Sequence, residues 1–143
     1  MLDKWSQRYF DLAKHVSQWS KDPSTKVGAV IVGESKKEIS IGYNGFPPGV
    51  EDLEHRLHHK GLKYHFTQHA ERNVLDNTLF KTKGATLIAT KFPCSECAKS
   101  IISRGIAKVI APAAEGEKWE LDAEYSEIMF HEAGVEVLIV DEK

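Results

Sequence analysis

The sequence predicts an α/β protein with a largely parallel sheet that helices cover on both faces. Helical and extended patterns alternate through the second half of the chain, which is typical of βαβ units. The apolar run VGAVIV at 27–32 is typical of a buried strand. Because 143 residues suffice for one hydrophobic core and not for two, we expect a single domain over residues 1–143.

The N-terminal residues 3–19 predict an amphipathic helix that packs on the core. Its large apolar side chains recur at helical spacing, and they are Trp5, Tyr9, Leu12, Val16 and Trp19. After a turn at Pro23, strands at 27–32 and 39–43 are joined by the loop GESKKE and predict an antiparallel hairpin.

Residues 50–68 are charged, rich in histidine and weakly periodic, so we expect a long loop with at most one helical turn. Long irregular segments in compact domains are often functional. The remaining predicted elements alternate along the chain: helix 70–79, strand 85–90, helix 95–104, strand 107–111, helix 122–133 and strand 135–140.

Composition and charge exclude several classes of protein. With 41% hydrophobic and 28% charged residues, the chain has the composition of a soluble globular protein. The formal net charge of −2 provides no overall basic surface for duplex nucleic acid. No apolar run approaches the length of a membrane span, and the N-terminus lacks the apolar core of a signal peptide. We therefore expect a cytoplasmic protein with no membrane partner.

Cys94 and Cys97 are the only cysteines, and they lie three positions apart where an apolar-periodic helix begins. Residues three apart share one face of a helix, and the positive end of a helix lowers the pKa of a thiol. In a reducing compartment such a pair indicates metal binding or redox chemistry rather than a structural disulfide. A structural zinc site needs four protein ligands. Two cysteines and one histidine would leave a fourth position open, as in catalytic zinc sites.

The segment HAERN at 69–73 supplies the best third ligand, His69, at the start of another helix. A thioredoxin-like redox motif would leave this segment without a role. Glu71 is a poor fourth ligand, because residues two apart point about 200° from each other in a regular helix. In a first turn it can still face a cavity and exchange protons with a water molecule. We therefore predict that His69, Cys94 and Cys97 bind the metal and that Glu71 is the general acid and base.

The pattern His69-Ala70-Glu71 followed by Pro93-Cys94-x-x-Cys97 is similar to the signature of the zinc nucleobase deaminases, in which the glutamate is not a metal ligand. The chain resembles the cytidine/deoxycytidylate deaminase superfamily and, within it, the deoxycytidylate (dCMP) deaminases. The resemblance extends over nearly the whole chain. Its main stretches are SKDPSTKVGAVIV, GYNGFPPGVED, KYHFTQHAERN and FPCSECAKSIISRGI.

This resemblance implies a three-layer α/β/α fold with a five-stranded mixed sheet and one Zn²⁺ per subunit. It implies hydrolysis of dCMP to dUMP and ammonia, which supplies dTMP synthesis in pyrimidine deoxynucleotide metabolism. Water would attack C4 of the cytosine ring, and Glu71 would pass protons to N3 and to the leaving ammonia. The resemblance also implies a homo-oligomer, often a hexamer.

The resemblance further implies where the substrate binds. Asn44 would contact the sugar, Lys26 would lie near the phosphate, and Ala70 would present its backbone to the base. The charged segment at 54–65 adds further candidates for binding an anionic nucleotide, namely Arg56, Lys63 and Tyr64. The histidines of this segment leave open whether a second metal binds there.

Three alternatives remain open on the sequence. The loop GFPPG lacks a basic residue that often follows its first proline in dCMP deaminases, so dCTP or a modified dCMP is the nearest alternative substrate. Another nucleobase, such as adenine in RNA or a free purine, is the second. The third is a zinc-stabilised binding module for single-stranded nucleic acid. That module would need tryptophans as stacking platforms, whereas the helical spacing of Trp5, Trp19 and Trp119 predicts core positions.

Overall fold

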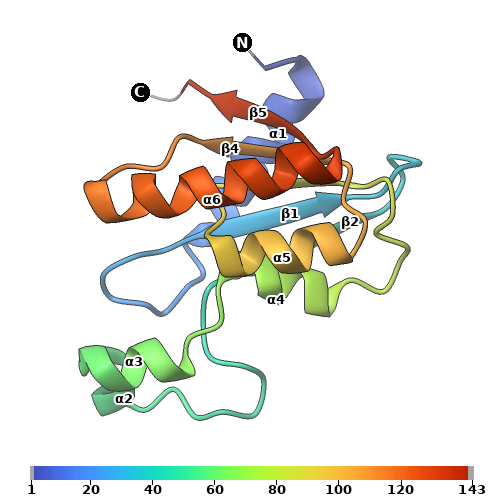
Figure 1. The fold of residues 1–143 in the computed structure, drawn as a ribbon. Helices are drawn as coiled ribbons and strands as arrows, with labels where there is room; N and C mark the ends of the chain where they lie inside the picture. The colour runs from blue at the N-terminus through green and yellow to red at the C-terminus, as the bar shows by residue number, and fades with distance from the viewer. Residues whose placement is uncertain (1, 142–143) are drawn as a thin grey trace.

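The computed structural model describes residues 2–141, which form one five-stranded sheet and the helices around it (Figure 1). The strands are β1 (Gly28–Val32), β2 (Ile39–Tyr43), β3 (Thr86–Ala89), β4 (Lys108–Pro112) and β5 (Glu136–Val140). The helices are α1 (Lys4–Ser17), α2 (Glu54–His58), α3 (Lys60–Phe66), α4 (Ala70–Asn77), α5 (Ser95–Ser103) and α6 (Glu117–Ala133).

The sheet is mixed, with the strand order β2-β1-β3-β4-β5. The predicted hairpin is confirmed, because β1 pairs antiparallel with β2. β1 also pairs antiparallel with β3, whereas β4 pairs in parallel with β3 on one side and with β5 on the other. The expectation of a largely parallel sheet therefore holds only for the C-terminal half. The hairpin makes β2 antiparallel to β1. The connection through α4 then brings β3 into the sheet in the direction of β2, so β3 is antiparallel to β1.

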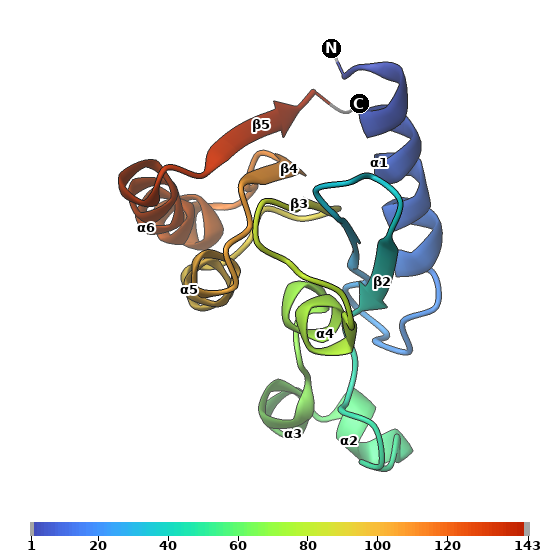
Figure 2. The same cartoon turned by 90° about the vertical axis from the view of Figure 1, so that its right-hand side faces the viewer.

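Helices cover both faces of the sheet, which confirms the three-layer α/β/α arrangement. Figure 2 shows α1 on one face and α4, α5 and α6 on the other. Alternate residues of β1 point to the two faces, as strand geometry requires. Val30 and Val32 pack with Phe10 of α1, whereas Ala29 and Ile31 pack in the larger cluster that contains residues of α4, α5 and α6.

Two glycines permit helices to approach this sheet closely. A Cβ atom on Gly28 would lie 2.7 Å from the backbone nitrogen of Ser17, at the end of α1. A Cβ atom on Gly42 would lie 2.7 Å from the backbone nitrogen of Val74 in α4. Only glycine fits at such contacts. The position of α4, which carries the predicted catalytic glutamate, therefore requires a residue without a side chain at position 42.

The predicted buried face of α1 is confirmed only in part: Val16 is buried and Tyr9 and Leu12 pack half-buried against the core, whereas the two tryptophans do not. Its buried stripe is offset from the aromatic one and consists of Ser6, Phe10, Ala13, Val16 and Ser17. Trp5 is 57% exposed and Trp19 is 49% exposed, so neither is a core residue. Ala13 and Ser17, whose side chains are small, lie where the helix backbone approaches β1 at Gly28, and this contact turns Trp5 and Trp19 away from the sheet. Trp119 is half-buried.

Two further differences concern the boundaries of helices. Residues 50–68 contain two short helices, α2 and α3, instead of at most one turn. These helices extend away from the sheet below α4 and α5 in Figure 1. Helix α6 begins at Glu117 rather than at 122. Gly116 adopts a φ of 95° immediately before it, and acidic residues in the first turn stabilise the positive end of the helix.

Among residues 2–141, no helix is both long enough and apolar enough to cross a membrane.

Candidate active site

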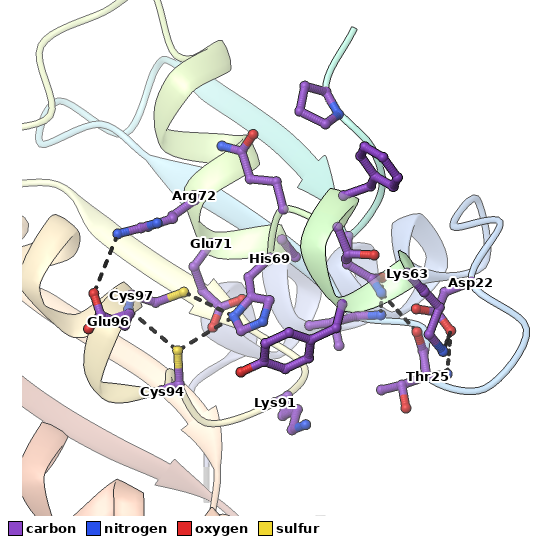
Figure 3. A pocket seen from close by; sticks show the side chains of 18 of the residues that line it. Asp22, Thr25, Lys63, His69, Glu71, Arg72, Lys91, Cys94, Glu96 and Cys97 are labelled. Atoms are coloured by element: carbon purple, nitrogen blue, oxygen red, sulfur yellow. Dashed lines mark hydrogen bonds and ion pairs between the residues drawn. The ribbon is translucent and has the colours of Figure 1, made fainter. Parts of the chain in front are cut away.

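Three ligand side chains meet where two helices begin. His69 is the N-cap residue of α4, Cys94 is the N-cap residue of α5, and Cys97 lies in the first turn of α5. Their ligand atoms all lie within 4.8 Å of one another. The Nδ1 atom of His69 is 3.5 Å from the Cys94 sulfur and 3.4 Å from the Cys97 sulfur (Figure 3). The His69 side chain makes no capping hydrogen bond to α4, so its ring is free to face the sulfur atoms.

The chemistry of this cluster fits a zinc ion. The Cys97 thiol donates a hydrogen bond to Cys94 and lowers the pKa of Cys94 to about 4, with a further contribution from His69. The same hydrogen bond and burial raise the pKa of Cys97, so without a cation only one of the two thiols ionises. The hydrogen bond to Cys94 raises the pKa of His69. A divalent cation would permit two thiolates, and two sulfurs with one imidazole nitrogen form a zinc ligand set with one open position.

The histidine-rich segment at 54–65 does not form a second site of this kind. Within the described part of the chain, no other cluster brings three or more His, Cys, Asp or Glu ligand atoms together. His58 is paired instead with Glu54 at 3.0 Å, and the His59 ring accepts a hydrogen bond from the backbone of Leu62.

Glu71 is buried beside the cluster and lines the same cavity. Only 4% of its surface is exposed, and no lysine or arginine between residues 2 and 141 forms an ion pair with it. Burial raises the pKa of Glu71 from 4.5 to about 7, although the nearby charge of His69 opposes this rise. Figure 3 shows the carboxylate next to the His69 ring. The side chain can therefore hold or release a proton near neutral pH beside the ligand cluster.

Contacts from α6 that the sequence did not predict hold the cysteine helix in place, although the helix itself was predicted. The Asp122 carboxylate of α6 accepts hydrogen bonds from the backbone nitrogen of Ser95 at 2.8 Å and from its hydroxyl at 2.7 Å. Ser126 of α6 donates a hydrogen bond to the carbonyl of Pro93 at 3.0 Å. These contacts fix the start of α5 on both sides of Cys94. No local pattern could have revealed them, because α6 lies more than twenty residues away.

The cluster lies in a cavity of about 1390 Å³. Four of the six predicted substrate contacts line it: Asn44, Lys63, Tyr64 and Ala70. The amide of Asn44 is buried, where it accepts a hydrogen bond from Val27 and donates one to the carbonyl of Thr25, both at 2.8 Å. Asn44 thus forms part of the cavity wall.

Lys63 and Tyr64 line the cavity from α3. Lys63 forms an ion pair with Asp22 at 3.1 Å, and its partner carboxylate is almost fully buried. This pair links α3 to the loop that precedes β1. Tyr64 is 75% exposed and lies at the rim.

Lys26 and Arg56 do not line the cavity. The Lys26 ammonium donates to the backbone carbonyl of Ser20. The Arg56 guanidinium lies 4.7 Å from the ring centroid of Phe66 and donates to the carbonyl of Glu51. A carbonyl and an aromatic face thus hold these two cations away from the ligand cluster.

Sequence reasoning also missed Lys91 and Trp119, which both line the cavity. The Lys91 nitrogen lies 4.0 Å from the centroid of the Trp119 ring. One available signal was the position of Lys91 two residues beyond the end of β3, because residues at the carboxyl ends of parallel strands form the sites of α/β proteins. No comparable signal was present for Trp119.

Comparisons with known proteins agree with this geometry. Residues 3–113 match the model of the cytidine and deoxycytidylate deaminase zinc-binding region. The chain is 41% identical over 140 residues to an uncharacterized deaminase in the luxG 3′ region of Aliivibrio fischeri, covering 96% of this chain and 94% of that protein. It is 35% identical over 141 residues to the deoxycytidylate deaminase of Homo sapiens, covering 92% of this chain and 77% of the human protein.

A solved structure shows the same fold. The dCMP deaminase from the cyanophage S-TIM5, in complex with dCMP and dUMP, superposes with a TM-score of 0.77 at 28% identity. The superposition covers 98% of this chain and 99% of the cyanophage chain. The matched region includes the two helix starts that carry His69, Cys94 and Cys97. From the shared sequence, fold and ligand cluster we conclude that this chain belongs to the cytidine and deoxycytidylate deaminase family and is a zinc-binding member of it.

Proposed function

We propose that this protein hydrolyses the bond between C4 and the amino group of dCMP and releases dUMP and ammonia. The observation that carries the proposal is a single cavity that contains a zinc-type ligand cluster and a buried glutamate. The 35% identity to the human deoxycytidylate deaminase supports the choice of substrate. So does the likeness to the cyanophage enzyme, whose structure contains dCMP and dUMP.

In this proposal His69, Cys94 and Cys97 hold the metal, and Glu71 moves the protons. When bound, zinc supplies a Lewis acid that makes water nucleophilic near neutral pH. Glu71 takes a proton from the water that attacks C4 of the cytosine ring. The carboxyl passes this proton to N3. It then takes the second proton from the hydroxyl now bonded to C4 and donates it to the amino group, which leaves as ammonia while the C4 carbonyl forms; its pKa of about 7 permits both transfers.

The remaining cavity residues bind the nucleotide. The backbone of Ala70, which is fully buried next to His69, faces the base. Asn44 contacts the sugar through the amide hydrogen that its two wall contacts leave available. Lys63 and Tyr64 close the side of the cavity that α3 forms.

We further propose that copies of the chain associate in the cytoplasm as a homo-oligomer, with a hexamer as the expected form. Apolar side chains are exposed on α6 and on the edge strand β5, and they are Leu121, Tyr125, Ile128 and Ile139. Such faces favour association. A site with two free thiols favours a reducing compartment. Light scattering after size-exclusion chromatography tests the oligomer directly.

A substrate panel tests the proposed reaction. The zinc-loaded protein is incubated with dCMP, deoxycytidine, CMP, dCTP, adenine and guanine, and ammonia release is followed. We expect dCMP to have the highest kcat/KM and Glu71→Ala to abolish release while zinc stays bound. A preference for dCTP or for a purine would refute the choice of substrate, and release from none of the compounds would refute the enzymatic reaction.

A further inference from the structure

Most cations that line the cavity already have a partner. Lys63 is paired with Asp22 at 3.1 Å, and Lys99 is paired with Glu96 at 2.9 Å. The Arg104 guanidinium donates to the carbonyl of Leu75 at 3.0 Å. Because these cations are already bound to groups of the protein, they are less available to a ligand.

Lys91 differs from them. No carboxylate within residues 2–141 forms an ion pair with it, and it lies in the short segment between β3 and α5 that leads to the cysteines. Its side chain lines the same cavity as the ligand cluster. Lys60 lines the cavity without a carboxylate partner as well, but it is exposed on α3.

The Lys91 side chain is held in place by an aromatic ring. Its nitrogen lies 4.0 Å from the Trp119 centroid, within cation–π range. In Figure 3, Lys91 lies below the His69 ring and the ligand cluster. A half-buried ammonium that is already oriented loses little conformational entropy when an anion binds to it.

We propose that Lys91 binds the phosphate of the nucleotide substrate and thereby selects nucleotides over nucleosides. The proposal rests on the proposed deamination of dCMP. The cytosine and the sugar carry no charge, so the phosphate is the one group of dCMP that gains strongly from an unpaired ammonium. Lys91 thus takes the role that the sequence suggested for Lys26, whose ammonium is bound to a backbone carbonyl outside the cavity.

The test compares a substrate with a phosphate and one without it. The values of kcat/KM for dCMP and for deoxycytidine are measured with zinc-loaded wild-type protein, Lys91→Met, Lys91→Arg and Lys118→Met. Lys118 is the matched control, because its nitrogen lies 5.1 Å from the same Trp119 ring but it does not line the cavity. Zinc content verifies that each variant retains the site.

We expect Lys91→Met to reduce kcat/KM for dCMP about 10- to 100-fold, mainly through KM, as for the loss of a hydrogen bond to a charged group. The kcat/KM for deoxycytidine should change less than about 3-fold, because deoxycytidine has no phosphate for Lys91 to bind. Lys91→Arg keeps the positive charge and should retain most of the preference for dCMP, and Lys118→Met should behave as the wild type does.

Two outcomes would overturn the assignment. An equal loss for both substrates in Lys91→Met would mean that the charge acts on the base or on the site rather than on the phosphate. An unchanged preference for dCMP would mean that another group binds the phosphate. If the wild-type protein deaminates neither compound, the proposed function fails first. If instead the wild type prefers dCMP and Lys91→Met keeps that preference, the proposed function stands and only the role of Lys91 is refuted.

Discussion

Replacing Glu71 with glutamine should lower turnover by orders of magnitude and stabilise the metal-free protein at high pH. The side chain is 4% exposed and, within the described residues, no lysine or arginine forms an ion pair with it, so its ionised form is poorly solvated. Glutamine has nearly the same shape and carries no charge. It therefore removes both the proton transfer and the cost of a buried carboxylate.

The direction of the pH dependence follows from the two states of the carboxyl. In the unfolded chain it ionises near the ordinary pKa of 4.5, whereas in the folded, metal-free protein the pKa is about 7. The stabilisation of the protonated folded form is complete below pH 4.5 and is lost as the pH rises to about 7. At 1.36 kcal/mol per pH unit, the loss is about 3 kcal/mol.

Urea unfolding at pH 5 and pH 8, after the metal has been removed with a chelator, measures this effect. Part of the loss has already occurred at pH 5, so the stability of Glu71→Gln relative to wild type should increase by about 2–3 kcal/mol between the two pH values. Titration of His69 and the cysteines occurs in both proteins and largely cancels in the difference. Glu127→Gln, which removes an exposed carboxylate on α6, controls for the change in net charge.

A stability difference that does not change between pH 5 and pH 8 would refute the buried-carboxylate reasoning. In the zinc-loaded protein, Glu71→Gln should bind one equivalent of zinc and lose at least about 10²- to 10⁴-fold in kcat, the usual contribution of a general acid and base. Wild-type turnover in that variant would refute the proton-transfer role.

Three other changes test the geometry around the site. Cys94→Ala should lose the metal, and zinc analysis that still finds one tightly bound equivalent would contradict the ligand assignment. Asp122→Ala removes two hydrogen bonds at the start of α5 and should lower the free energy of unfolding by about 1 kcal/mol and weaken zinc binding; unchanged urea and zinc titrations would argue against this role. Gly42→Ala places a Cβ atom 2.7 Å from the backbone of α4 and should destabilise the protein by about 1–3 kcal/mol in urea. Gly45→Ala is its control, since a Cβ atom there meets nothing within 4 Å, and equal stabilities of the two variants would contradict the close packing.

Local patterns predicted most of the architecture because helical and extended periods are properties of short segments. The hairpin at β1 and β2 and the helices that begin near His69 and Cys94 follow from such patterns. The face of α1 could not be chosen in this way. The predicted stripe and the buried one have the same period and share Val16, and the close contact at Gly28 decides that Ala13 and Ser17 rather than Trp5 and Trp19 face the sheet.

The sequence by itself determined the ligand cluster, because its three residues lie at helix starts and their types and spacing suffice to select a metal. Tertiary structure decided which charges remain available around that cluster. Lys63 is neutralised by Asp22, which lies 41 residues away, and Lys91 meets the ring of Trp119. It also decided the pKa of Glu71, since burial depends on every segment packed around the carboxyl. Spacing along the chain sets which residue types recur on one helix, whereas pairing and burial depend on distances between segments that only the folded chain brings together.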